Sequence, residues 1–96
     1  MIAATSFQAY RTLDPAQVAS VKARVLLTIA RARMPSNADI ERLAGIRLSS
    51  VCARINELKA DGMVEAGGIK TDPFTRKGVQ WWRITEAGRR ALEAMA

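Results

Sequence analysis

The sequence predicts a mostly α-helical domain that carries one small β-hairpin, an α+β fold in a single unit. Three observations support this prediction. Apolar residues recur every three or four positions up to Leu58, the period shortens towards two after Gly62, and a helical pattern returns after Thr85. A chain of 96 residues has room for one hydrophobic core. All of these elements are therefore expected to share it.

The first predicted helix begins at an N-cap signature. Asp14 precedes Pro15 and is followed by Gln17, and together they supply an N-cap acceptor, a proline at the first helical position and a capping-box partner. Apolar residues then recur at helical spacing, at Val18, Val21, Val25 and Ile29. We expect this helix to run to about Arg33 and to end before Pro35.

Two short helices around a glycine follow. Ser36 and Asp39 mark the start of the first. Its apolar side is expected to carry Ile40, Leu43 and Ala44. Gly45 is expected to end it, and the next helix opens at Leu48 or Ser49. The apolar side of that helix is made of Val51, Ile55 and Leu58. This tandem is the helix-turn-helix pattern.

After Gly62, the expected left-handed C-cap of that helix, the sequence favours strands. We expect strands over residues 63–66 and 79–84. The long loop between them contains the turn formers Gly67, Gly68, Asp72, Pro73 and Gly78. Thr85 is the expected N-cap of a last helix, whose inward side should carry Ala87, Ala91, Leu92 and Met95. The complete order is helix, helix, turn, helix, hairpin, helix.

Charge narrows the classes of partner. The chain has 15 Lys and Arg against 9 Asp and Glu, a net charge of +6, which favours a polyanion such as nucleic acid. A membrane is the weaker alternative, because no apolar run approaches the roughly 20 residues needed to cross a bilayer and residues 1–7 lack a signal-peptide pattern. We therefore expect a cytoplasmic protein. The single cysteine, Cys52, fits a reducing compartment.

The composition argues against catalysis. The chain has no histidine, the commonest general base and metal ligand, and one cysteine cannot complete a zinc site of the Cys/His type. No pair of acids lies between apolar residues in the way that carboxylate catalysis requires. We therefore expect no enzyme activity, no metal and no cofactor.

The order of elements and five short stretches resemble the winged helix-turn-helix fold of MarR-like and phage-encoded regulators. The stretches are SNADI at 36–40, SSV at 49–51, NEL at 56–58, DGMV at 61–64 and WRITEAG at 82–88. The resemblance extends over residues 13–96. It implies that the helix opening at residue 48 or 49 is a recognition helix for the DNA major groove, and that the hairpin is a wing along the DNA backbone.

The chain departs from MarR-like proteins in two ways. Ala44 replaces a larger apolar residue, with Leu43 beside it, and no long terminal helix of the kind that joins two MarR-like protomers is expected within residues 1–96. The first departure leaves the predicted fold intact. The second bears on how two copies would meet.

The outer side of the predicted recognition helix carries small or uncharged polar residues. Such residues let a helix approach base edges, where Asn bonds adenine and Ser bonds several bases. The candidate DNA-reading residues are Ser49, Ser50, Ala53, Arg54 and Asn56. The alternative is an ordinary solvated helix face, on which Arg54 pairs with Glu57 or Glu41.

Cations beside this helix and in the hairpin are candidates for the DNA backbone. The candidate phosphate contacts are Arg47, Lys70, Arg76, Lys77 and Arg83, with Arg54 at the border of the reading surface. Within the hairpin loop only Asp72 opposes them. Phosphate contacts give affinity without sequence information. The alternative is a loop that is charged only for solubility.

Trp81 and Trp82 are adjacent on a strand and are expected to point to opposite faces. Trp82 shares its face with Ile84 and is expected in the core. Trp81 either stacks against a partner or covers the hairpin. Cys52 is expected to be a small half-buried residue, with a redox switch as the alternative.

These observations predict a protein that binds double-stranded DNA with sequence preference, as a transcriptional regulator or a phage-type accessory protein. Two alternatives stay open: an adaptor for other proteins built on the same fold, and a binder of structured RNA. A single recognition helix covers few base pairs, so we expect a homodimer on two half-sites. Residues 1–12 are expected to be an N-terminal arm, with a frayed terminus as the alternative. Phe7 and Tyr10 of this arm, together with the first helix, would join the two copies.

Overall fold

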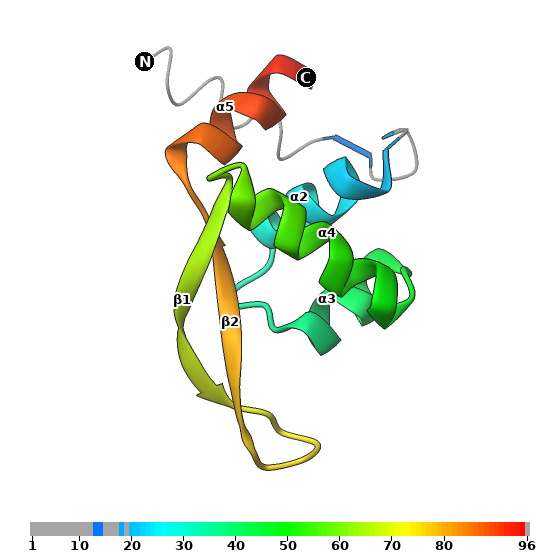
Figure 1. Cartoon of the computed structure of the whole chain (residues 1–96). Helices are drawn as coiled ribbons and strands as arrows, with labels where there is room; N and C mark the ends of the chain where they lie inside the picture. Colours follow the sequence, from blue (N-terminus) through cyan, green and yellow to red (C-terminus); the bar gives the residue numbers. More distant parts are fainter. Residues whose placement is uncertain (1–12, 15–17, 19, 96) are drawn as a thin grey trace.

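The computed structural model describes residues 13, 14, 18 and 20–95. They form a mostly α-helical domain with one β-hairpin, which confirms the predicted fold class (Figure 1). The elements are α2 (Val21–Arg31), α3 (Asn37–Ala44), α4 (Leu48–Ala60), β1 (Val64–Thr71), β2 (Gly78–Ile84) and α5 (Glu86–Met95). Helices α2, α3 and α4 lie to one side of the hairpin, and its distal half projects beyond them. The predicted arm, residues 1–12, lies outside the described residues.

Helix α2 is shorter at both ends than predicted. Ser20 has extended backbone angles, φ −91° and ψ 134°, and its hydroxyl oxygen accepts a hydrogen bond from the Ala23 N–H at 3.2 Å. An N-cap residue cannot lie inside a helix, so the prediction of one continuous helix from Pro15 onwards was wrong. The helix ends at Arg31, earlier than predicted, because Ala32 is extended.

The ends of α3 and α4 follow the predicted capping. The Ser36 hydroxyl accepts from the Asp39 N–H at 3.3 Å and the Asp39 carboxylate accepts from the Ser36 N–H at 3.0 Å, which completes a capping box. Gly45 ends α3 with a φ of 67°. Gly62 follows α4 with a φ of 74°. The Met63 N–H then donates to the Leu58 carbonyl at 2.9 Å, which completes a Schellman motif.

Leu43 does not face the core, contrary to the prediction. Its side chain is 59% exposed, whereas Ile40 and Ala44 pack inward. Two residues four positions apart lie directly above one another on a helix, and they already fill the contact between α3 and the core. Leu43 therefore lies at the rim, beside a surface groove lined by Leu27, Thr28, Arg31 and Ala32.

Strand β1 extends through two glycines that were predicted as loop residues. It pairs antiparallel with β2 along its length, with a bulge between Ala66 and Gly68. A Cβ atom on Gly67 would stand 2.1 Å from the Trp81 ring, so only glycine leaves room for this indole. The loop prediction was wrong because the partner strand needs that space. Trp81 covers the hairpin, which is one of its two predicted roles.

The core lies where the helices meet the hairpin. Its largest buried side chains include Leu27, Ile40, Ile55, Leu58 and Leu92. Trp82 joins them and is 8% exposed, as predicted. The backbone N–H of Trp82 donates to the Pro35 carbonyl at 2.9 Å, and an isolated antiparallel β-bridge pairs Ser36 with Trp81. The segment before α3 is thereby fixed against β2.

Helix α5 packs at the base of the hairpin through Gly88, Ala91 and Leu92. Thr85 caps it as predicted, because its hydroxyl accepts from the Gly88 N–H at 3.2 Å. Ala87 and Met95 are exposed, so their predicted inward orientation was wrong. Gly88 is buried in their place, since the Met63 carbonyl oxygen lies 2.3 Å from where a Cβ on Gly88 would stand. The close approach of α5 to the hairpin depends on that glycine.

Candidate nucleic-acid interface

Helix α4 holds the five candidate DNA-reading residues outside the core. Its buried side carries the residues predicted for it, Val51, Ile55 and Leu58. Two candidates are exposed, Ser49 and Asn56, and three are half-buried, Ser50, Ala53 and Arg54. Helical spacing places Ser49, Ala53 and Asn56 together opposite the core, whereas Ser50 and Arg54 lie on one flank. The fold therefore gathers part of the candidate set on one surface.

An acid from the preceding helix holds the start of α4. Arg47 occupies the N-cap position, but its side chain makes no cap hydrogen bond. Glu41 of α3 supplies it, because its carboxylate accepts from the Leu48 N–H at 3.2 Å. The sequence suggested Glu41 only as an ion-pair partner of Arg54. Its observed role is to position the first turn of α4, which leaves the Arg47 side chain exposed beside Ser49.

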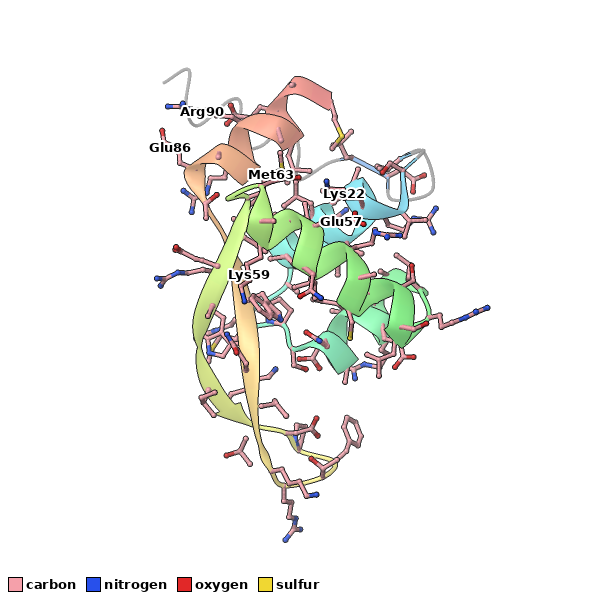
Figure 2. All side chains as sticks on the ribbon, viewed as in Figure 1. Lys22, Glu57, Lys59, Met63, Glu86 and Arg90 are labelled. Atoms are coloured by element: carbon pink, nitrogen blue, oxygen red, sulfur yellow. The ribbon has the colours of Figure 1, made fainter. Side chains whose placement is uncertain are left out.

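Arg54 is paired within its own helix. Its Nε donates to Glu57 Oε1 at 3.0 Å and its Nη2 donates to Glu57 Oε2 at 2.7 Å. Figure 2 shows Glu57 on the side of α4 away from the hairpin. A contact of Arg54 with phosphate therefore requires this pair to open. Exposed pairs contribute only about 0.2–1 kcal/mol, so phosphate can compete for the guanidinium.

A surface groove runs between α4 and β2. Its walls include Asn37, Leu48, Cys52, Val79, Gln80 and Trp82. The Asn37 amide joins the two sides: Oδ1 accepts from Trp82 Nε1 at 2.7 Å, and Nδ2 donates to Cys52 Sγ at 3.3 Å. Sequence reasoning missed Asn37. The available signal was Trp82 itself, because a buried indole N–H needs an acceptor.

Lys59 is a second residue that sequence reasoning missed. Its Nζ lies 5.7 Å from the centre of the Trp82 ring, a cation–π contact. Figure 2 shows Lys59 on the side of α4 that faces the hairpin, opposite to Glu57. A cation therefore stands between the helix and the hairpin, at the edge of the candidate reading surface.

Two of the four candidate cations of the hairpin are held in ion pairs, and the other two lie at its tip. Arg83 pairs with Glu65 at 2.8 Å on the exposed outer surface, and Lys70 pairs with Asp39 of α3 at 2.5 Å. Arg76 and Lys77 lie at the tip and are exposed. Within the described part of the chain, the side chains of these two make no ion pair. As far as the described residues show, the tip therefore presents positive charge that no acidic side chain neutralises.

Asp72 builds the tip of the hairpin. Its Oδ1 accepts from the N–H groups of Phe74 at 2.7 Å and Thr75 at 3.1 Å. Its N–H donates to the Lys77 carbonyl and its carbonyl accepts from the Arg76 N–H, both at 2.8 Å. The one acid of the loop thus satisfies backbone donors, and it holds the loop in a defined shape with both cations outward.

Asp39 lies where α3 meets the hairpin. Burial raises the pKa of its carboxyl, but hydrogen bonds from Lys70, the Ser36 N–H and Arg42 outweigh burial and hold the pKa well below its usual range. A pKa lowered by folding stabilises the fold above about pH 4, and this stabilisation is lost as the pH falls further. Asp39 is therefore charged near neutral pH, and its contact with Lys70 persists there.

Potential metal ligands do not gather in residues 13, 14, 18 and 20–95, where no group of three or more His, Cys, Asp and Glu side chains is placed to hold a metal ion. Of the helices in that part of the chain, none combines the length and apolar character needed to cross a membrane.

No protein-family model matches the chain, and no curated protein sequence matches it. Solved structures do match. Bordetella bronchiseptica BpsR, from a study of how 6-hydroxynicotinic acid regulates its DNA binding, has a TM-score of 0.65 and 21% identity over 98% of this chain and 68% of BpsR. Streptococcus pneumoniae FabT in complex with DNA has a TM-score of 0.65 and 15% identity over 98% of this chain and 63% of FabT.

A third match is a mutant of MarR from E. coli, complexed with operator DNA. It has a TM-score of 0.60 and 19% identity, over 95% of this chain and 60% of that protein. The chain thus spans 60–68% of the length of these structures. At such identities the likeness establishes the fold and confirms that the hairpin is the wing. The chain therefore has a MarR-like winged helix-turn-helix fold.

Proposed function

We propose that this chain binds double-stranded DNA with sequence preference, as a transcriptional regulator or a phage-type accessory protein. The observation that carries the proposal is that the fold presents two surfaces: the polar outer side of α4, and the wing tip with the exposed cations Arg76 and Lys77, which make no ion pair with any described residue. A winged helix uses these two parts for the major groove and the DNA backbone. The net charge of +6 supports the proposal, and FabT and the MarR mutant are complexes with DNA.

The residues take different roles in this proposal. Ser49, Ala53 and Asn56 read base edges from the centre of the α4 surface, with Ser50 and Arg54 at its flank. Phosphates are bound by three exposed cations that make no ion pair within residues 13, 14, 18 and 20–95: Arg47, Arg76 and Lys77. Lys70 and Arg83 reach phosphates only where their ion pairs open.

Selection of bound sequences from a random duplex pool, followed by a salt titration on the selected site, tests the proposal. The logarithm of the affinity should fall linearly with the logarithm of the salt concentration, by about 0.9 for each phosphate contact. Affinity that is indifferent to salt, or a pool that yields no preferred site, would contradict it.

The wing contacts give a direct prediction. Arg76→Ala with Lys77→Ala should weaken binding to the selected site and to random duplexes about equally, and should lower the salt slope by roughly 1 per lost phosphate contact. The matched control is Arg89→Ala with Arg90→Ala, which removes the same charge from α5, a helix at the opposite end of the hairpin from the tip (Figure 1). An unchanged slope in the wing variant, or an equal change in the control, would show that the tip does not bind phosphates.

One observation favours a second function, an adaptor for another protein. Phe74 and Ile69 of the wing are 79% and 71% exposed, and exposed apolar side chains of this size suit a protein partner. An adaptor held by such contacts would bind with little dependence on salt, whereas DNA binding weakens steeply. The third alternative is a binder of structured RNA. Adding structured RNA as a competitor in the same titration distinguishes it from a DNA-binding protein.

We also propose a homodimer joined by residues 1 to about 30. Residues 1–12 lie outside the described part of the chain, so the proposal rests on their aromatic residues and on the need for two half-sites. Deletion of residues 1–11 should convert a dimer into a folded monomer and weaken binding to a roughly palindromic site. Light scattering measures the mass. A full-length protein that is monomeric even at high protein concentration, on the order of tens of micromolar, and binds a non-palindromic site tightly would contradict the dimer.

A further inference from the structure

One carboxylate links the wing to the body of the domain. Asp39 Oδ2 accepts from Lys70 Nζ of β1 at 2.5 Å and from the Ser36 N–H at 3.0 Å, while Oδ1 accepts from Arg42 Nη2 at 2.9 Å. Its side chain is 17% exposed. Arg42 continues the network, because its Cζ lies 5.8 Å from the centre of the Phe74 ring at the wing tip. A single group therefore connects the start of α3 to both the stem and the tip of the wing.

The distal half of the wing depends on this connection for its orientation. The proximal half is anchored by Val64 and Trp82 in the core and by the bond to Pro35. The distal half projects past the helices (Figure 1), and Ile69 and Phe74 on it are largely exposed. A two-stranded ribbon is marginally stable without packing. The contacts of Asp39 and Arg42 therefore hold the tip in place relative to α3, and through α3 relative to α4.

We propose that Asp39 is a positioning residue that favours specific over non-specific DNA binding, by fixing the wing and by keeping Lys70 and Arg42 away from phosphates. This inference rests on the proposed function. A cation released from Asp39 strengthens binding to every duplex, because each phosphate contact releases counterions whatever the sequence. A loosened wing, in contrast, must be ordered again when it fits one site, which weakens specific binding.

Asp39→Asn is the central variant. Asparagine keeps an oxygen that accepts the Ser36 N–H, but it removes the charge that holds Lys70 and Arg42. The variant should bind random duplexes more tightly at low salt, with a salt slope steeper by about 1 for each cation that reaches a phosphate. Its preference for the selected site over random duplexes should fall roughly tenfold, the effect of ordering one or two side chains again.

Two further variants separate position from charge. Lys70→Met breaks the same link without releasing a cation from the wing, so the preference for the selected site should fall while the slope does not steepen. Glu65→Gln is the matched control, because it releases Arg83 from a pair that lies within the wing. It should steepen the slope and leave the preference intact. Thermal unfolding checks that each variant is folded. If Asp39→Asn does not fold, Lys70→Met alone tests whether the link positions the wing.

Amide hydrogen exchange of residues 69–79 without DNA gives a readout that does not depend on the proposed function. Exchange should be faster in Asp39→Asn and Lys70→Met than in the wild type and in Glu65→Gln. Unchanged exchange, or equal losses of affinity for both duplexes with an unchanged slope, would overturn the positioning role. A wild-type chain with no salt-dependent duplex binding would instead overturn the proposed function, and the exchange result would still test the link.

Discussion

Gly88→Ala is expected to lower the free energy of unfolding by about 1–3 kcal/mol, although alanine normally favours a helix over glycine by roughly 1 kcal/mol. A Cβ at this position would stand 2.3 Å from the Met63 carbonyl oxygen and 2.6 Å from Ile84 Cγ1. That carbonyl also accepts from the Thr85 N–H at 3.0 Å, so it cannot move aside without losing this bond. Helix α5 must therefore shift away from the base of the wing.

Thermal unfolding followed by circular dichroism measures this effect, and a loss of 1 kcal/mol corresponds to a midpoint lower by about 4–8 °C in a domain of this size. The matched control is Ala87→Gly on the exposed side of the same helix. It reports helix propensity alone and should cost no more than about 1 kcal/mol. A midpoint raised by Gly88→Ala would mean that α5 does not pack on the wing as closely as the structure has it.

Asn56→Ala is expected to reduce discrimination at one base pair by roughly 1–3 kcal/mol, the value of a good bidentate contact. Asn56 is exposed on α4, and within the described residues its side chain has no hydrogen-bond partner. The unfolding midpoint should therefore stay almost unchanged while sequence preference is lost. Binding to the selected site and to each single-base variant of it measures the effect.

Ser50→Ala should act in the same way at a different base pair, with a smaller effect because Ser50 is half-buried on the flank of the reading surface. Thr71→Ala, at the end of β1, is the control and should change no base preference. Full sequence preference in both Asn56→Ala and Ser50→Ala would show that α4 is not the reading helix.

The predictions that succeeded depend on residues close together in the chain. The capping box of Ser36 and Asp39, the left-handed Gly62 and the Thr85 cap each form within one turn of backbone. Such signals act through local hydrogen bonds, so they hold whatever the rest of the fold does. The prediction of where α2 begins was wrong for a related reason. Asp14 and Ser20 are both residue types that cap helices, and the structure has the N-cap of α2 at Ser20.

The predictions that failed depend on distant partners. Gly67 belongs to a strand because of Trp81, and Gly88 is buried because of Met63. The sequence shows which elements carry the cations and polar residues of the candidate interface. It does not show which of them form ion pairs or hydrogen bonds with distant residues. Lys70 meets Asp39 across 31 positions, and Asn37 meets Trp82 across 45.

The sequence by itself determined the order of the elements, the apolar side of α4 and the residue types on its outer side, because periodicity and capping are properties of short segments. The tertiary structure alone decided which cations of the wing are already paired, which glycines are close contacts, and that one carboxylate of α3 holds the wing. These depend on the distances between elements, which are set when the common core packs and not by any one segment.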